Sequence, residues 1–249
     1  AVRALWLGDR ARMNPGWKHP APEGWYDLAW GAVAEDLGTG DASSAAIDPE
    51  KTIKWSIEAQ GNGVACGIGI AVGLLQPEGD DPVDCFADAL MTDGDKLRQG
   101  DRVAEGIAVA TRLLSRERTV LNFLMLLSGT ATLTRAFVDK VKTLDVDIVD
   151  TRKTVPYMRS LQKYAVRCGG GRNHRMGLYD GIMLKDNHIL AAGSIKAVVE
   201  AARANAGHMA LVEVECENLE QVEEAVNAGA DIVMLDNMDP FMMKDAVKK

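Results

Sequence analysis

The second half of the chain alternates short apolar runs with amphipathic helical stretches. The apolar runs are DVDIVD (145–150), GIMLKDNHI (181–189), ALVEVE (210–215) and DIVMLDN (231–237). The helical stretches cover approximately residues 156–168, 194–206, 219–228 and the region from 240 onward. Strands that alternate with helices in this way are parallel, and repeated units of about 30 residues are typical of a β/α barrel. We therefore expect this half to form a parallel α/β barrel.

Three of the helical stretches carry start signals. Asn218 is followed three residues later by Gln221, which resembles a capping box, and Ser194 follows a glycine. Asp239 places a capping residue before Pro240 at the first helical position. These residues satisfy or tolerate the unpaired N–H groups of a first helical turn, so the sequence predicts helices that begin at these points.

The first half of the chain predicts short strands and tight turns. Ile53, Trp55 and Ile57 alternate with polar neighbours, which is the period of a half-buried strand. Turn signals follow at residues 61–63 (GNG) and 93–95 (DGD), and the segment 93–109 predicts strands joined by tight turns.

A long helical pattern connects the two halves. Apolar residues recur at helical spacing over residues 115–139, with a break predicted near Ser128 and Gly129. We interpret this segment as a helix pair between two domains. The expected domains are an N-terminal α/β sandwich over residues 1–116, with the linking helix beginning near its end, and an α/β barrel over residues 117–249.

The composition excludes several classes of function. A net charge of -8 argues against a general nucleic-acid binder, which needs a basic face to displace counterions. No apolar run approaches the roughly 18 residues that a membrane helix needs. The cysteines are scattered without a CxxC pair, so the sequence predicts neither a zinc site nor a disulfide framework. We expect a protein of the reducing cytoplasm, with no nucleic-acid or membrane partner.

Residues 151–188 form a basic island in this acidic chain, with eight Lys and Arg residues against two Asp residues. Such an island indicates a small polyanionic ligand. The alternative is an ordinary charged helix surface, and it stays equally open for Arg159, Lys163 and Arg167, which share one helical stretch.

Polar residues follow the apolar runs at the points where strands are expected to end. They are the segments 150–153 (DTRK) and 185–188 (KDNH), then Glu213 and Glu215, then 236–237 (DN). In a parallel barrel these ends converge on the face that carries the active site. Two residues apart on one strand, Glu213 and Glu215 project to the same side and need a cation or a metal nearby. The alternative is an internal salt bridge to Lys153 or Lys185.

These residues predict a pocket with cations on one side and carboxylates on the other. Arginine binds two oxygens of a carboxylate or phosphate at once, while Glu215 and Asp236 are suited to Mg²⁺ that bridges a diphosphate. His174 lies in a glycine-rich loop whose backbone can approach a ligand. The other histidines (His19, His188 and His208) are expected to be structural.

Five motifs in this order and spacing resemble quinolinate phosphoribosyltransferases. They are DTRKT (150–154), CGGGRNHRMGL (168–178), KDNHI (185–189), VEVE (212–215) and MLDN (234–237), and the match extends through EDLGTGD (35–41) and RERTVLNFLMLLSGTAT (116–132). The resemblance implies an N-terminal α/β sandwich, an incomplete α/β barrel and a homodimer with shared active sites. It also implies transfer of a phosphoribosyl group to quinolinate with decarboxylation, which yields nicotinate mononucleotide for NAD biosynthesis.

The resemblance also implies a role for each site residue. Arg152, His174 and Arg175 would hold the quinolinate carboxylates, together with Arg118 from the partner subunit. Lys153 and Lys185 would lie between quinolinate and phosphoribosyl pyrophosphate. Glu215, preferred to Glu213, would serve the ribose hydroxyls and Mg²⁺ with Asp236. The catalytic set expected in this way is Lys153, Lys185, Glu215 and Asp236.

One departure leaves other functions open. Family members continue beyond the last helical stretch for one or two more βα units, which this sequence does not contain. The alternatives are a molybdenum-transport-associated relative of the same fold, a Schiff-base aldolase barrel that uses Lys153 or Lys185, and a non-catalytic ligand-binding barrel.

Overall fold

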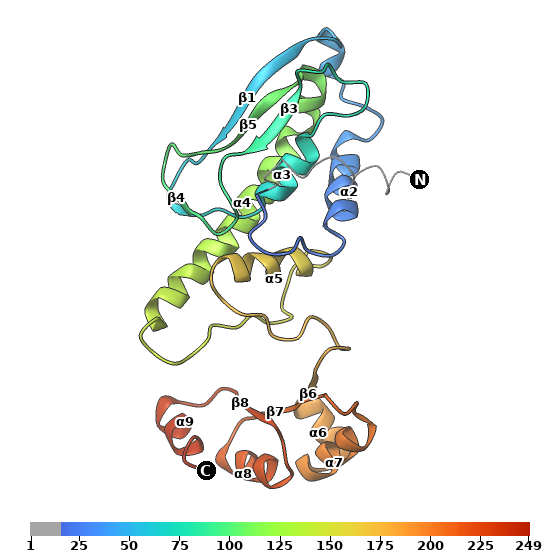
Figure 1. The fold of residues 1–249 in the computed structure, drawn as a ribbon. Coiled ribbons are helices and arrows are strands. Elements are labelled where there is room, and N and C mark those ends of the chain that lie inside the picture. Colours follow the sequence, from blue (N-terminus) through green and yellow to red (C-terminus); the bar gives the residue numbers. More distant parts are fainter. Residues whose placement is uncertain (1–15) are drawn as a thin grey trace. The chain divides into compact units, whose positions relative to one another are not determined.

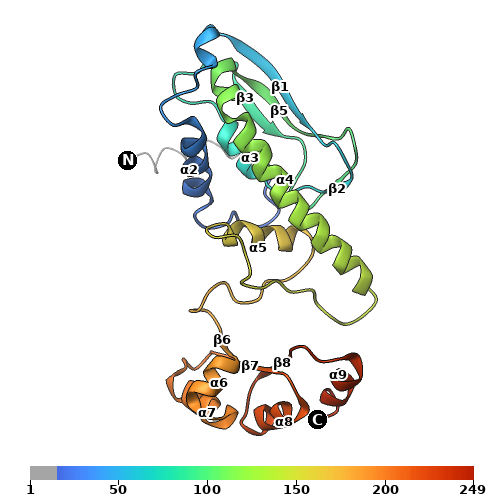
Figure 2. The ribbon, with the colours of Figure 1, turned by 180° about the vertical axis from the view of Figure 1, so that it is seen from behind.

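The computed structural model describes residues 16–249, and this part of the chain divides into two compact units. The first unit ends at His174 and the second covers Arg175–Lys249. Each unit is described by itself below. Both are mixtures of helices and strands (Figures 1 and 2), as expected for an α/β sandwich followed by part of a parallel α/β barrel.

The first unit contains an antiparallel sheet with the strand order β1-β5-β3. The strands are β1 (Thr52–Glu58), β3 (Phe86–Ala89) and β5 (Arg102–Val109), and a second small ladder joins β2 (Gly63–Val64) to β4 (Lys96–Leu97). In β1 the apolar residues are half-buried while their polar neighbours are exposed, so the predicted alternation is confirmed.

The helices of the first unit are α2 (Trp25–Leu37), α3 (Ile68–Leu75), α4 (Ala110–Val141) and α5 (Arg159–Cys168), with a short 3-10 turn at Ser44–Ala46. Helices α3 and α4 pack against the sheet, α2 packs against these two helices, and α5 crosses α4 beyond the sheet (Figures 1 and 2). The core of the unit joins apolar residues of α3, α4 and α5 with the inner face of the sheet. Helix α3 is buried almost throughout, because it lies between the sheet and α4.

The predicted break in the long helical segment is wrong, because α4 runs through it without interruption. Gly129 is exposed inside the helix, where a glycine costs only about 1 kcal/mol relative to alanine. The Ser128 hydroxyl accepts a hydrogen bond from the Cys66 amide (3.0 Å) and donates one to the Cys66 carbonyl (3.1 Å). Ser128, one of the two residues that indicated a break, therefore joins α4 to the loop before α3.

By length and composition alone, α4 is apolar enough to cross a membrane, although the sequence predicts no membrane helix. Part of its apolar surface is buried, because Val120, Phe123 and Leu127 lie in the core of the first unit. Met125 and Leu133 of the same helix are exposed. A single helix of this kind does not establish a membrane span, since core helices meet the same criterion.

The run DVDIVD (145–150) does not form the strand that the sequence predicts. Its only β contact in the described structure is a parallel bridge between Val149 and Arg172. Three of its residues are acidic, and Val146 and Val149 are both exposed, so the segment has no apolar face to bury. Asp150 is the exception, because its side chain is buried beside α5.

The second unit contains three parallel strands in the order β6-β7-β8 (Figure 1). The strands are β6 (Ile182–Leu184), β7 (Val212–Cys216) and β8 (Ile232–Leu235), and the helices are α6 (Asp186–Ala192), α7 (Ile195–Asn205), α8 (Leu219–Asn227) and α9 (Pro240–Ala246). Val212, Val214 and Cys216 of β7 belong to a core shared with α7 and α8. Glu213 and Glu215 therefore project from the opposite side of β7, which is the interior side in a barrel.

The predicted helix starts in this unit are confirmed. The side chains of Ser194 and Asn218 accept hydrogen bonds from the N–H three residues later, at 3.1 and 2.9 Å. Asp239 accepts from the amides of Phe241 and Met242, and Pro240 occupies the first helical position. Local sequence chemistry therefore sets the beginning of α7, α8 and α9.

Two glycine substitutions test the packing of the first unit. A Cβ at Gly106 would lie 2.1 Å from the Phe86 carbonyl oxygen and 2.6 Å from the Trp55 ring. Gly106→Ala should therefore lower the free energy of unfolding by about 1–3 kcal/mol, through strain in the central strand. Gly31 is exposed in α2 with no atom within 4 Å, so Gly31→Ala should raise it by about 0.5–1 kcal/mol. Urea denaturation measures both, and equal midpoints for the two variants would contradict the packing.

Asp93 predicts a pH dependence of stability. Burial raises the pKa of this fully buried carboxyl from 3.8 to about 6. Between about pH 4 and pH 6 the unfolded chain loses a proton that the folded chain keeps, so this group's contribution to stability falls as pH rises. The loss is on the order of 3 kcal/mol, completed as the pH passes the folded pKa. The free energy of unfolding should be measured from pH 3.5 to 7 for the wild type and for Asp93→Asn. It should fall with rising pH more steeply in the wild type, and parallel pH dependences of the two proteins would contradict the prediction.

Candidate active site

Three predicted site residues lie at the carboxyl ends of the parallel strands in the second unit. Lys185 directly follows β6, Glu215 is the second-last residue of β7, and Asp236 directly follows β8. The register pairs Glu215 with Met234, two residues before Asp236. Because the strands are parallel and adjacent, their carboxyl ends share one edge of the sheet, which confirms that the strand ends bring these charges to one side.

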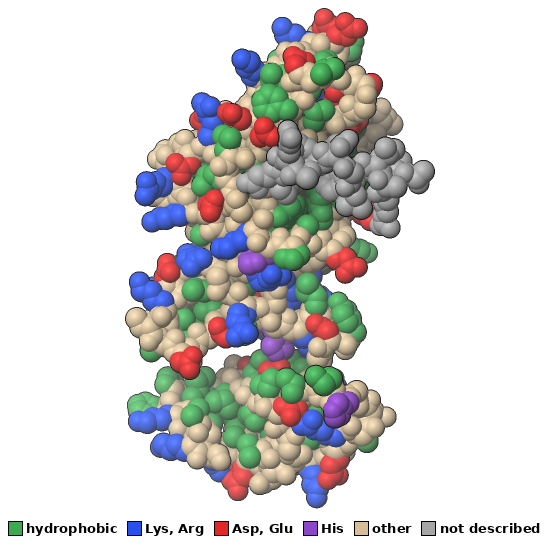
Figure 3. All heavy atoms as spheres, viewed as in Figure 1, with side chains coloured by type: hydrophobic (Ala, Val, Ile, Leu, Met, Phe, Trp, Pro, Cys, Tyr) green, Lys and Arg blue, Asp and Glu red, His purple; other side chains and the backbone are tan. Residues whose placement is uncertain are grey.

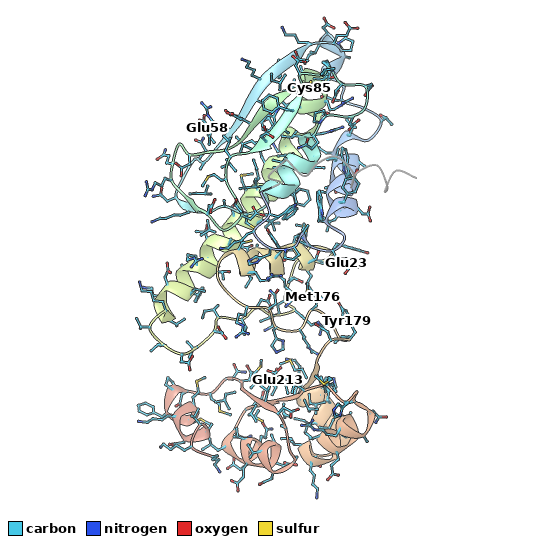
Figure 4. The ribbon with its side chains drawn as sticks, in the orientation of Figure 1. Glu23, Glu58, Cys85, Met176, Tyr179 and Glu213 are labelled. Atoms are coloured by element: carbon cyan, nitrogen blue, oxygen red, sulfur yellow. The ribbon has the colours of Figure 1, made fainter. Side chains whose placement is uncertain are left out.

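Lys185 and Glu215 form an ion pair across this edge. The Glu215 carboxyl is largely buried, with 15% of its side chain exposed, while the Lys185 side chain is 39% exposed. The internal salt bridge considered for the glutamates is thus observed for Glu215, with Lys185 as the partner. Glu213, labelled in Figure 4, is buried and Glu215 is half-buried, so Glu215 is the more accessible of the two.

Asp236 and the following residue form a polar turn. The Asn237 side-chain amide donates to the Asp236 carboxylate at 2.9 Å, and the Asp236 N–H donates to the Cys216 carbonyl, also at 2.9 Å. Asn237 has a φ of 52°, a left-handed conformation that asparagine tolerates better than most residues. This turn holds the Asp236 backbone beside the end of β7.

The glycine-rich loop of the first unit is held by a buried charge pair. Lys163 of α5 is completely buried and forms an ion pair with Asp150. The Asp150 carboxylate also accepts the His174 N–H at 2.9 Å, and Lys163 donates to the His174 carbonyl at 3.0 Å. Neither interpretation of the basic island fits Lys163, because a buried, paired lysine is neither a surface residue nor a ligand contact.

Other members of the basic island differ in their surroundings. Lys153 is exposed, whereas Arg152 is half-buried and its Nε has no hydrogen-bond partner. Arg172 is exposed and pairs with Asp147 at 2.6 Å. A buried donor without a partner costs about 1–3 kcal/mol, so Arg152 is the residue of this segment that gains most from an incoming acceptor.

Arg118 is exposed on α4 and lines two depressions of the first unit. One has a volume of about 480 Å³ and includes Glu35 and Asp36 of α2 together with Met158. The other has a volume of about 940 Å³ and includes Trp55 and residues along α4. Arg118 is thus accessible from outside this unit, which is the property required of a residue that serves another subunit.

Arg175 belongs to a tight loop in the second unit. Its guanidinium donates to the Gly181 carbonyl at 3.0 Å. The Asp180 carboxylate accepts the N–H groups of Met176 and Gly177, at 2.7 and 2.8 Å. Met176 and Tyr179 of this loop are labelled in Figure 4. The loop is therefore folded by its own hydrogen bonds.

The remaining histidines, His19, His188 and His208, differ in their contacts. The His188 Nδ1 accepts the Lys185 N–H at 3.1 Å and so caps α6. His19 packs edge-on against Tyr164, and burial lowers the pKa of its imidazole. His208 is exposed. His188 therefore has the structural contact that was predicted, and the predictions for His19 and His208 stay predictions.

The sequence analysis missed one cluster in the core of the first unit. The ligand atoms of Cys66, Asp93 and Cys168, all three buried, lie within 4.8 Å of one another. A hydrogen bond with Cys168 and burial raise the pKa of the Cys66 thiol, and Asp93 already accepts from Tyr164 (2.8 Å) and the Ile68 amide (3.0 Å). We interpret the cluster as packed core. The cysteines are distant in sequence, so no spacing motif could have indicated it.

On the face seen in Figure 3, basic and acidic side chains are interspersed on both units. The charged residues that form local groups are those at the strand ends of the second unit and those around the glycine-rich loop. A parallel β/α unit with such charges at the carboxyl ends of its strands defines a barrel-type enzyme domain for anionic substrates.

Comparisons with known proteins specify this class. The family model "Quinolinate phosphoribosyl transferase, N-terminal domain" matches residues 41–128, and the corresponding C-terminal domain model matches residues 130–249. The chain therefore belongs to the quinolinate phosphoribosyltransferase family. The boundary between the two models falls inside helix α4, as does the domain boundary at residues 116 and 117 expected from the sequence.

Individual relatives agree with this assignment. The chain is 46% identical to a probable nicotinate-nucleotide pyrophosphorylase (carboxylating) of Bacillus subtilis, over 86% of this chain and 73% of the relative. It is 38% identical to the Mycobacterium leprae nicotinate-nucleotide pyrophosphorylase (carboxylating), over 88% of this chain and 77% of the relative. The solved structure of the Ehrlichia chaffeensis nicotinate-nucleotide pyrophosphorylase matches with a TM-score of 0.84 at 36% identity, over 90% of this chain and 80% of that one.

Proposed function

We propose that the chain transfers the phosphoribosyl group of phosphoribosyl pyrophosphate to quinolinate with loss of carbon dioxide, giving nicotinate mononucleotide and pyrophosphate for NAD biosynthesis. The observation that carries the proposal is the match of both family domains in sequence order, over residues 41–128 and 130–249. The charges at the two groups of site residues suit a dicarboxylate and a diphosphate ester.

The residues proposed for the carboxylates are three arginines and a histidine. Arg152 is half-buried and its Nε has no hydrogen-bond partner, and the backbone of His174, in the same unit, is fixed by Asp150 and Lys163. Arg175 completes the set, and Arg118 serves the neighbouring subunit. Lys153 is exposed and available to either substrate. Guanidinium groups bind planar carboxylates with two parallel hydrogen bonds, which favours a substrate with two such groups.

The residues proposed for phosphoribosyl pyrophosphate are Lys185, Glu215 and Asp236. Two carboxylates on adjacent strand ends fit Mg²⁺, which is usually held by one or two carboxylates together with substrate phosphates rather than by a complete protein cage. In the described structure Glu215 and Asp236 lie at the ends of the neighbouring strands β7 and β8, and Glu215 is paired with Lys185. When bound, the ion would neutralise charge on the departing pyrophosphate.

The mechanism that these residues support is electrostatic. Glu215 and Asp236 hold the ribose hydroxyls while the bond from the sugar carbon to pyrophosphate breaks and the pyridine nitrogen bonds to that carbon. The ring, now cationic, loses its 2-carboxylate as carbon dioxide, and the electron pair left on ring carbon 2 takes up a proton from water. Lys153 and Lys185 orient the anionic substrates, and fixed charges in a site shielded from water contribute about 3 kcal/mol per well-placed donor. The residues need not form a covalent bond to either substrate.

Incubation with quinolinate, phosphoribosyl pyrophosphate and Mg²⁺ should produce nicotinate mononucleotide, measured by chromatography. Quinolinate should also bind more tightly than nicotinate, because nicotinate leaves a cation of the site unpaired at a cost of about 1–3 kcal/mol. Calorimetry measures both affinities. Equal affinities would contradict the dicarboxylate site, and absence of product would contradict the function as a whole and favour a relative with another substrate, an aldolase or a binding protein.

Glu215→Gln and Asp236→Asn should raise the KM for phosphoribosyl pyrophosphate and the Mg²⁺ requirement by about tenfold or more, since each removes one carboxylate ligand. Quinolinate binding should change little. Asp231→Asn is the matched control, because Asp231 lies at the amino end of the same sheet and pairs with Arg203 at 2.7 Å. If either strand-end variant lost quinolinate binding first, the two groups of residues would be wrongly assigned.

We also propose a cytoplasmic homodimer in which Arg118 completes the neighbouring subunit's site. Arg118→Ala and Lys153→Ala should each be nearly inactive. A mixed dimer would then contain one intact and one doubly damaged site, so random co-refolding should restore about a quarter of wild-type activity. Mass spectrometry confirms subunit exchange. No recovery despite confirmed exchange would show that Arg118 serves its own subunit.

A further inference from the structure

Lys163 and Asp150 stand out among the charged residues of the first unit because both are buried and neither is part of the proposed substrate contacts. The side chain of Lys163 is 1% exposed and that of Asp150 is 7% exposed. They come from different places: Lys163 lies in α5, and Asp150 lies in the irregular segment that follows α4. Burial of two charges costs several kcal/mol each, so the pair demands an explanation beyond stability.

Both members of the pair bind the backbone of one residue. Asp150 accepts the His174 N–H (2.9 Å), and Lys163 donates to the His174 carbonyl (3.0 Å). Asn173 is held in the same way, since its side-chain amide donates to the Asp150 carboxylate (2.6 Å) and to the Lys163 carbonyl (2.9 Å). One ion pair therefore fixes two successive residues of the glycine-rich loop.

Backbone hydrogen bonds attach the residues that precede Asn173 to the rest of the unit. Gly171 donates to the Val166 carbonyl at 3.0 Å, and Arg172 exchanges backbone hydrogen bonds with Ile148 (2.9 Å) and Asp150 (3.2 Å). Asn173 and His174 follow directly and are bonded to Asp150 and Lys163. Three glycines precede Arg172, and glycine backbone loses the most conformational freedom on ordering. The ion pair therefore adds attachment points to a segment whose ordering is costly.

We propose that Asp150 and Lys163 are positioning residues, which hold the backbone of His174 and so place its imidazole for the carboxylate of quinolinate. This inference rests on the proposed function only for the identity of the ligand. An apolar pair of similar volume is often as stable as a buried ion pair, so stability alone does not account for these two charges. The fixed loop backbone does account for them.

The test compares the KM values of three variants, at Asp150, Lys163 and Tyr164. Asp150→Asn keeps the shape of the side chain and removes its charge, and Lys163→Met keeps the aliphatic stem. Tyr164→Phe is the matched control: it lies next to Lys163 on α5 and loses the buried hydrogen bond to Asp93 (2.8 Å), a residue outside the glycine-rich loop. Asp150→Asn should raise the KM for quinolinate about tenfold or more, with little change in the KM for phosphoribosyl pyrophosphate, because a small misplacement of a binding group is costly.

A double-mutant cycle tests whether the pair acts through His174. In a His174→Ala background the backbone contacts remain but the imidazole is gone, so Asp150→Asn should change the KM for quinolinate less than twofold. Additive effects, or an equal KM increase in Tyr164→Phe, would overturn the positioning role. If Lys163→Met does not fold, the comparison of Asp150→Asn with Tyr164→Phe still decides.

Amide hydrogen exchange provides a readout without activity. In Asp150→Asn the amides of residues 172–174 should exchange at least tenfold faster than in the wild type, while Tyr164→Phe leaves them unchanged. Faster exchange in a protein that does not bind quinolinate would refute the proposed function and retain the positioning role. Unchanged exchange would refute the positioning role whatever the activity.

Discussion

In each unit a buried or largely buried charged side chain is paired with a side chain of opposite charge, and the neighbouring structure depends on that pair. In the first unit the ammonium group of Lys163 is enclosed, and Asp150 must lie beside it because an isolated buried charge is prohibitively costly. The position of Asp150 then determines the course of the segment after α4 and of the glycine-rich loop, since both are bonded to that carboxylate. In the second unit Glu215 projects from the face of β7 away from the apolar core and takes Lys185 of the neighbouring strand end as its partner.

Local sequence chemistry predicted the second unit well. Its strands are short and apolar, and its helices begin at residues whose side chains accept the first N–H groups, so propensity and packing agree. The failures came where tertiary contacts override a local signal. Ser128 and Gly129 read as a break, yet the Ser128 hydroxyl binds the backbone of Cys66, 62 residues away, and α4 continues. DVDIVD read as a strand, but it has no apolar face to bury.

The candidate site was predictable where it depends on strand ends and unpredictable where it depends on burial. A residue that follows an apolar run in a β/α repeat must emerge at the carboxyl edge, so Lys185, Glu215 and Asp236 could be grouped from sequence. Lys163 could not be assigned, because at helical spacing a buried lysine and a surface lysine look alike. Its partner Asp150 lies 13 residues earlier, in a segment without regular structure. The resemblance carried the motif that contains Asp150 but no role for it.

The two lysine–carboxylate pairs differ in what can displace them. Lys163 and Asp150 are closed to solvent and bonded to backbone, so separating them would leave two buried charges without compensation. Lys185 is 39% exposed and Glu215 is 15% exposed, so this pair meets solvent mainly on the lysine side. An anion can therefore approach Lys185, whereas the largely buried Glu215 carboxylate needs another cation if Lys185 moves away. The buried pair is suited to hold a loop permanently, and the exposed pair is suited to keep a binding group neutralised until a ligand arrives.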